Sequence, residues 1–138
     1  MQHVFLYKLL DESKNGVIGK FLADNSDYYN QLKSASSGLF PDGGNFNGYI
    51  AVTPEHPFYG KDYDEVNAML HKKDFYVHGG LTLASDSSFC PHLPTEHHQF
   101  WILGFDTRHA SDTAEYWTEE RTWEEADKLM QAAINYGE

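Results

Sequence analysis

The feature that most constrains the fold is an apolar segment without charge, Phe100–Phe105, which ends directly in polar residues. A short apolar run of this kind is typical of a buried β-strand. Asp106, His109 and Asp112 follow it at three-residue spacing. Functional side chains are often placed where a rigid strand ends. The segment therefore predicts a polar site at the end of a buried strand.

A second apolar segment, Phe75–Leu83, contains His78, Gly79 and Gly80 and is predicted to be another strand. Glycine weakens a strand, so a pair of glycines indicates a bulge or a close approach of the backbone to another group. Amides freed beside an imidazole could hold a phosphate or carboxylate oxygen. The alternative is a bulge that contains a hydrogen-bonded core histidine, and the sequence leaves both open.

The C-terminal segment has the clearest helical pattern. Thr122 and Glu125 have the spacing of a capping box, in which each side chain satisfies a backbone amide at the helix start. Apolar residues then recur at three- and four-residue spacing, namely Ala126, Leu129, Met130, Ala133 and Ile134. We therefore expect an amphipathic helix that packs on the sheet.

Periodicity and turn residues predict the remaining elements. We expect strands over Val4–Tyr7 and Gly48–Thr53. Helices are expected over Val17–Leu32 and over Tyr63–Leu70, the second with Asp62 as its N-cap. The expected polar loops are Asp11–Gly16, Ser34–Gly48 and Ser85–His98. The predicted fold is a single α+β domain over residues 1–138. It consists mainly of antiparallel sheet with two or three helices.

The charge balance limits the partners. The chain has 138 residues and a formal net charge of -11, from 21 acidic and 10 basic residues. Binding to nucleic-acid phosphates needs a basic surface, so we expect no direct nucleic-acid binding. The apolar segment Met1–Leu10 is too short to span a membrane and has no cleavage-site pattern. Cys90 is the only cysteine, so no intrachain disulfide can form. We therefore expect a soluble, cytoplasmic protein without membrane contact.

Asp106, His109 and Asp112 could share one face if the chain turns helically after the strand. A carboxylate would then orient His109 as a general base, and the same residue types also bind divalent metals. Alternatively, Asp106 caps a turn and Asp112 is solvated. His56 follows the strand Gly48–Thr53 and could join this pocket if the strands are neighbours. Cys90 has no cysteine partner and no HExxH spacing occurs, so no metal is assigned and the cofactor stays unknown.

Four motifs lie in the middle half of the chain, between Asn47 and Asp112: Asn47-Gly48-Tyr49-Ile50-Ala51-Val52, His56-Pro57-Phe58-Tyr59-Gly60, Val77-His78-Gly79-Gly80-Leu81-Thr82, and Gly104-Phe105-Asp106 with His109 and Asp112. In residue type and order they resemble a family of small proteins encoded by bacteriophages and prophages. The resemblance implies the cytoplasm of an infected bacterium as the setting, and no reaction. It also implies a common site built from His56, His78, Asp106, His109 and Asp112.

Three functions are compatible with these observations. The first is a phage accessory protein that binds a small, nucleotide-derived polar ligand and sequesters a host immune signal. The expected ligand-binding residues are His56, His78, Gly79, Gly80, Asp106, His109 and Asp112. The second is a hydrolase of phosphodiesters or nucleotides that uses His109 as general base. The third is an acidic mimic of DNA that inhibits a host nuclease through the stretch Asp112–Asp127. A homo-oligomer that completes the pocket across an interface also fits the sequence.

Overall fold

The computed structural model describes residues 4–26, 44–90, 93, 99–108 and 112–137. Its strands are β1 (Val4–Lys14), β2 (Val17–Asp24), β3 (Phe46–Val52), β4 (Leu83–Asp86) and β5 (Trp101–Phe105). Its helices are α2 (Tyr63–His71), the short 3-10 turn η1 (Ser87–Phe89) and α3 (Glu119–Tyr136). His109, the greater part of the expected loop Ser34–Gly48 and half of the expected loop Ser85–His98 lie outside the described residues.

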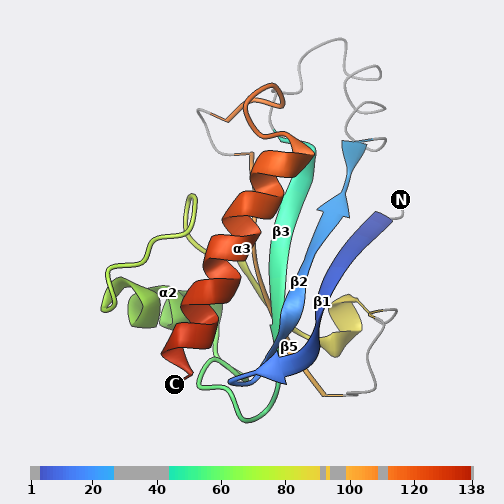
Figure 1. The fold of residues 1–138 in the computed structure, drawn as a ribbon. Coiled ribbons are helices and arrows are strands. Elements are labelled where there is room, and N and C mark those ends of the chain that lie inside the picture. The colour runs from blue at the N-terminus through green and yellow to red at the C-terminus, as the bar shows by residue number, and fades with distance from the viewer. Residues whose placement is uncertain (1–3, 27–43, 91–92, 94–98, 109–111, 138) are drawn as a thin grey trace.

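The five strands form one antiparallel sheet in the order β1-β2-β3-β5-β4. The helix α3 lies diagonally across one face of this sheet and contacts β2 and β3, while α2 lies beside it (Figure 1). The architecture is therefore α+β, as the sequence predicts. The strand predicted over Phe100–Phe105 is confirmed as β5 except for Phe100, and the strand predicted over Gly48–Thr53 is confirmed as part of β3 except for Thr53.

An apolar stripe holds α3 on the sheet. Its buried side chains are Thr122, Ala126, Leu129, Met130, Ala133 and Ile134, which include the complete predicted stripe. They pack with Ile50 and Val52 of β3 and with Phe58. Full burial of a leucine or isoleucine side chain contributes roughly 1.5–3 kcal/mol, so this stripe is a major source of stability.

The opposite face of the sheet carries a second core. Side chains of β2, β3 and β5 pack there with Cys90, Leu93 and Phe100. Phe21 stacks on Tyr49 with ring centroids 5.0 Å apart, and Phe89 of η1 lies 5.1 Å from Tyr49. Because β2 and β3 are covered on both faces, the sheet interior is apolar on both sides.

The helix predicted over Val17–Leu32 is wrong for its first half, since Val17–Asp24 forms β2. Val17 and Leu22 face the core under α3, whereas Ile18 and Phe21 face the second core. Burial on both faces removes the alternation that marks a half-buried strand. The loop predicted over Asp11–Gly16 is also wrong, because β1 continues to Lys14 and only Asn15 and Gly16 turn, both with positive φ. Asn-Gly is the strongest short sequence signal for such a hairpin.

Two further expectations need correction. Phe75–Thr82 is not a strand, and β4 begins only at Leu83. The helix α3 begins at Glu119, one turn before the predicted capping box, and the side chain of its N-cap Thr118 accepts from the Arg121 amide. Thr122 is buried within the first turn and donates to the carbonyl of Thr118 at 2.8 Å. The predicted cap of α2 is confirmed, since Asp62 accepts from the Tyr63 amide.

Two glycine–aromatic pairs join β3 to β5. In the register of these strands Gly48 lies opposite Phe105, and Tyr49 lies opposite Gly104. A Cβ on Gly104 would be 2.2 Å from the Tyr49 ring, and a Cβ on Gly48 would be 2.5 Å from the Phe105 ring. Each ring therefore lies over the glycine of the neighbouring strand, one on each face of the sheet.

Substitution Gly104→Ala should lower the free energy of unfolding by about 2–3 kcal/mol, because the new methyl group overlaps the buried ring of Tyr49. Urea denaturation measures this. Gly60→Ala is the matched control, since Gly60 has a φ of +77° but no atom within 4 Å of an added Cβ. It should cost only about 1 kcal/mol, from backbone conformation. Equal losses at the two positions would contradict the steric explanation.

Candidate functional site

The segment with His78, Gly79 and Gly80 forms a tight turn. The Gly80 amide donates to the carbonyl of Val77 at 2.9 Å, so Val77–Gly80 is a β-turn. Gly79, at the third position, has a φ of +67°, and Gly80 has a φ of +79°. Positive φ at the third position is the requirement of a type II turn and explains the first glycine. The two glycines thus serve a turn, where the sequence suggested a strand bulge.

The side chain of His78 binds Asp112. Its Nε2 atom lies 2.9 Å from each carboxylate oxygen of Asp112. The Trp117 indole donates to the same carboxylate at 3.2 Å, and its ring centroid is 4.3 Å from that of His78. The side chain of Asp112 is 5% exposed and that of His78 is 28% exposed. A buried carboxylate therefore orients a histidine that reaches solvent.

A second carboxylate holds the backbone of this turn to α3. Glu125 accepts a hydrogen bond from the His78 amide at 2.8 Å. An anionic group bound at His78 would thus meet the negative charges of Asp112 and Glu125. The geometry gives no support to the expected anion site, because the Gly80 amide is also engaged in the turn.

Asp106 organises the chain at the end of β5. It accepts from the Thr82 hydroxyl at 3.4 Å and from the Arg108 amide at 3.2 Å. The Arg108 side chain in turn donates to the carbonyl of Gly44 at 3.0 Å. Bonds from an Asp side chain to the amide two residues on are typical of polar turns. The predicted polar strand end is therefore present, and it connects three separate segments.

A surface cavity of about 240 Å³ lies beside Asp106. Its lining comes from β3, from β5 and from the approach to β4: Asn47, Tyr49, Thr82, Leu83, Gly104, Phe105 and Asp106. The Oδ1 atom of Asn47 is buried without a hydrogen bond in the described part of the chain. The cavity thus combines apolar walls with the polar side chains of Asn47, Thr82 and Asp106.

His56 lies elsewhere and has a structural role. Its Nδ1 accepts from the Phe58 amide at 3.0 Å, so the ring proton is on Nε2, which donates to the carbonyl of Ala133 at 2.8 Å. Ala133 is near the end of α3, roughly 12 Å along the helix from the Glu125 that holds His78. Burial lowers the pKa of His56, against a smaller opposing effect of the bond to Ala133.

The structure therefore divides the predicted site. His78 is hydrogen-bonded to Asp112, Asp106 lines a separate cavity, and the His56 side chain is buried in the core. His109 lies outside the described residues. Sequence reasoning missed Asn47, Trp117 and Glu125 as parts of these sites. Of these three, only Asn47 is indicated by the sequence pattern. It is the polar member of the alternating series Asn47, Tyr49 and Ala51, whose other side chains lie on an apolar face of the strand.

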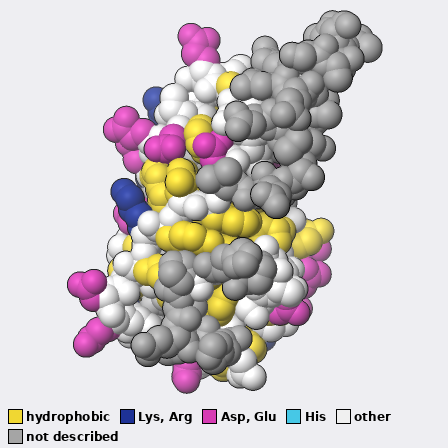
Figure 2. Space-filling view, turned by 90° about the vertical axis from the view of Figure 1, so that its right-hand side faces the viewer, with side chains coloured by type: hydrophobic (Ala, Val, Ile, Leu, Met, Phe, Trp, Pro, Cys, Tyr) yellow, Lys and Arg dark blue, Asp and Glu magenta, His cyan; other side chains and the backbone are white. Residues whose placement is uncertain are grey.

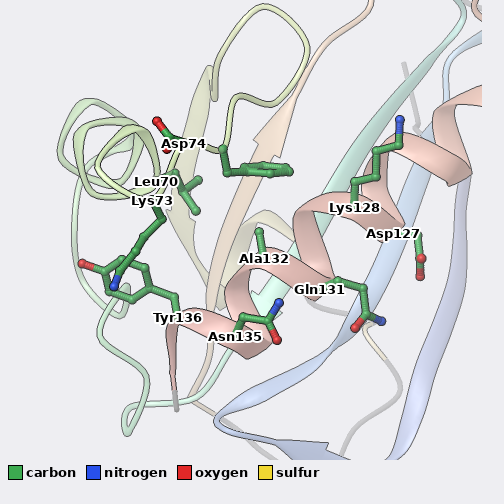
Figure 3. A pocket seen from close by; sticks show the side chains of 10 residues that line it. Leu70, Lys73, Asp74, Asp127, Lys128, Gln131, Ala132, Asn135 and Tyr136 are labelled. Carbon is green, nitrogen blue, oxygen red and sulfur yellow. The ribbon is translucent and has the colours of Figure 1, made fainter.

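A larger groove of about 620 Å³ lies between the end of α2 and the last turns of α3 (Figure 3). Two lysines and two aspartates contribute its charged lining, namely Lys73, Lys128, Asp74 and Asp127. Lys20 binds Asp127 at 2.7 Å, and Lys73 lies 5.9 Å from the centre of the Tyr136 ring. These charges balance one another and indicate no particular ligand.

Several carboxylates of the acidic stretch Asp112–Asp127 are engaged within the fold. Along the stretch proposed for DNA mimicry, Glu115, Glu119, Glu120 and Glu124 are exposed, whereas Glu125 binds the His78 amide and Asp127 binds Lys20. Figure 2 shows acidic side chains scattered around a band of hydrophobic ones on the side that it views. A DNA mimic needs carboxylates in a regular array, so the visible arrangement does not favour this function.

Comparison of the chain with protein-family models, with curated proteins and with solved structures finds no match. Within the described ranges, no group of three His, Cys, Asp or Glu side chains is arranged to hold a metal ion. Nor does any helix in that part of the chain combine the length and apolar composition needed to cross a membrane. The pair of His78 and Asp112 and the cavity beside Asp106 are therefore the two candidate sites.

The lowered pKa of His56 predicts a pH-dependent stability. In the unfolded chain His56 has an ordinary histidine pKa of about 6.5, so it binds a proton at a pH where the folded chain leaves it unprotonated. The free energy of unfolding should therefore fall as the pH decreases below about 6.5. His56→Gln should flatten this slope by up to about 1.4 kcal/mol per pH unit. Urea denaturation between pH 5 and pH 8 measures it, with the exposed His71→Gln as control. Equal slopes for wild type and His56→Gln would contradict the assignment.

The contacts of Asp112 predict an order of stability losses. Asp112→Ala should cost about 2–3 kcal/mol, because it leaves the Trp117 indole and the His78 ring without their acceptor. His78→Ala should cost less, since its side chain is partly exposed. The double variant should reveal a coupling of about 1 kcal/mol in chemical denaturation. Additive losses would show that the pair does not interact in solution.

Proposed function

We propose that the protein binds a small, nucleotide-derived ligand in the cavity at the end of β5. The observation that carries this proposal is the position of Asp106, whose carboxylate lines a cavity of about 240 Å³ beside Tyr49 and Leu83. A carboxylate accepts hydrogen bonds from ribose hydroxyls or base amino groups, and apolar walls accommodate a flat ring. The combination fits the sugar or base of a nucleotide.

The volume of the cavity and the charge of Asp106 limit which part of a nucleotide can enter the cavity. Pockets for whole drug-sized ligands measure roughly 300–1,000 Å³, so a cavity of about 240 Å³ admits one ring system and not a complete nucleotide. The net charge of -11 and the carboxylate of Asp106 repel phosphate. The ligand is therefore recognised through its ring, with any phosphate held outside the cavity.

Binding is a better account of this cavity than catalysis. Its described lining offers one carboxylate, Asp106, and one hydroxyl, Thr82, but no histidine that would activate this hydroxyl as a nucleophile. A phage accessory protein that sequesters a nucleotide-derived host immune signal needs affinity alone. The resemblance to small phage proteins supports this biological setting, in the cytoplasm of an infected bacterium.

Asp106→Asn should weaken ligand binding about tenfold or more, because it removes the charge that accepts from the ligand while keeping the shape of the side chain. Isothermal titration calorimetry with a panel of nucleosides, nucleoside monophosphates and cyclic dinucleotides measures the affinity. Asp64→Asn, an exposed carboxylate on α2, is the matched control and should leave affinity unchanged. Absence of binding by every member of the panel would refute the proposed function.

A second candidate function is supported by the pair of His78 and Asp112. A buried carboxylate that accepts a hydrogen bond from Nε2 of His78 leaves Nδ1 available to accept a proton, which is the arrangement of an oriented general base. In this case the protein would be a hydrolase in which His78 activates water, and the phosphate of a phosphodiester substrate would lie away from the carboxylates of Asp112 and Glu125. Turnover of cyclic dinucleotides by wild type but not by His78→Gln would support this function over simple binding.

A further inference from the structure

The end of α2 forms one wall of the groove between α2 and α3. Asp74 has a φ of +58°, and its amide donates to the carbonyl of His71 at 3.0 Å. The Phe75 amide donates to the carbonyl of Leu70 at 3.1 Å. This hydrogen-bond pattern is a Schellman motif, which turns the chain back over the last turn of a helix. The partly exposed ring of Phe75 therefore lies in the lining of the groove, close to Leu70.

The wall on the α3 side combines a small side chain with two amides. Ala132 lies at the centre of this wall and leaves room in front of the helix (Figure 3). Gln131 and Asn135 are exposed and line the groove on either side of it. Tyr136 adds a partly exposed ring at the end of α3. All four side chains are accessible to a molecule in the groove.

The two amides have the spacing of a peptide backbone. Gln131 and Asn135 are four residues apart on α3, which is about 6 Å along the helix axis. In an extended chain, peptide groups that point to the same side recur at every second residue, about 6.6 Å apart. Each amide side chain offers a donor and an acceptor, as a peptide group does. Gln131 and Asn135 can thus pair with two successive peptide groups on one side of an extended segment.

The charges of the lining favour an uncharged occupant. The two lysines and two aspartates of the groove sum to zero, and Asp127 is already bound by Lys20 of β2. An acidic ligand would be repelled by the net charge of -11, and a basic one would meet Lys73 and Lys128 inside the groove. An apolar segment without charge meets neither penalty.

We propose that the groove between α2 and α3 binds an uncharged, apolar segment of a protein chain in extended conformation. The peptide groups of the segment pair with Gln131 and Asn135. Its side chains pack against Phe75 and into the space in front of Ala132. Recognition of an extended backbone by hydrogen bonds, with apolar contacts for alternate side chains, is a common mode of peptide binding.

The dimensions of the groove agree with such a segment. The part of α3 from Lys128 to Tyr136 is about 12 Å long, which equals about four residues of an extended chain. The volume of about 620 Å³ lies within the range of roughly 300–1,000 Å³ that is usual for binding sites. The groove shares no lining residue with the cavity beside Asp106, so this inference is independent of the proposed function.

The test uses the capped tetrapeptide acetyl-Leu-Ala-Leu-Ala-amide and the same peptide with N-methylated backbone amides. Binding is measured by titration in two-dimensional NMR of the full chain. The unmethylated peptide should shift the signals of Gln131 and Asn135. The methylated peptide should bind about fivefold or more weakly, because it cannot donate to the two side-chain oxygens.

Substitutions on the two helices locate the site. Ala132→Leu should weaken binding about tenfold or more, because the larger side chain fills the space in front of α3. Ala68→Leu is the matched control, since Ala68 is exposed on α2 and does not line the groove, and it should leave the affinity unchanged. Asn135→Leu should reduce the preference for the unmethylated peptide. Because Asn135 is exposed, this variant carries the test if Ala132→Leu does not fold.

Each opposite result would overturn the inference. Equal affinity for the two peptides would exclude recognition of the backbone by the amides. Tighter binding of acetyl-Glu-Ala-Glu-Ala-amide would show that the groove selects an acidic partner. Signals that shift only around Asp106 would assign the peptide to the other cavity, and absence of shifts at millimolar peptide would exclude binding.

Discussion

The packing of α3 on the sheet is the interaction on which the rest of the structure depends. Its apolar stripe closes one core, and both ends of the helix are tied to distant parts of the chain. Near its C-terminus the carbonyls of Ala133 and Ile134 accept from His56 and from Asn15 of the β1–β2 turn. Such side-chain donors satisfy carbonyls that a helix end otherwise leaves exposed. Near its N-terminus Glu125 holds the backbone of His78. The two histidines of the predicted site that the structure describes, His56 and His78, are thus both held by one helix.

The sequence predicts those elements whose pattern is local. The stripe of α3, the Asp62 cap of α2 and the apolar run of β5 each follow from residues within a few positions of one another. The prediction fails at β2, because burial on both faces gives a continuous apolar segment that also fits a helix. It fails again at Phe75–Thr82, where backbone conformation at Gly79 and Gly80 overrides apolar composition.

The candidate site shows the same division. The polar end of β5 is predictable because Asp106 follows the strand directly. The contact of His78 with Asp112 and the separation of His56 from both depend on how distant segments fold over α3. Asn47 illustrates a further difficulty, since an asparagine in a strand is conspicuous only when its neighbours on the same face are known. Spacing along a chain does not report such proximity.

The glycine–aromatic pairs of β3 and β5 have a consequence for how the sheet assembles. A slip of two residues keeps every side chain on its own face, and hydrophobic patterning alone does not oppose it. In this sheet, however, such a slip would move Phe105 from Gly48 to Ile50, or Tyr49 from Gly104 to Ile102. In either direction one of the two rings would then face a branched side chain in place of a glycine, and it would have to leave its present position over the neighbouring strand. The two glycines therefore favour one register of β3 and β5. This register determines which side chains lie together at the end of β5.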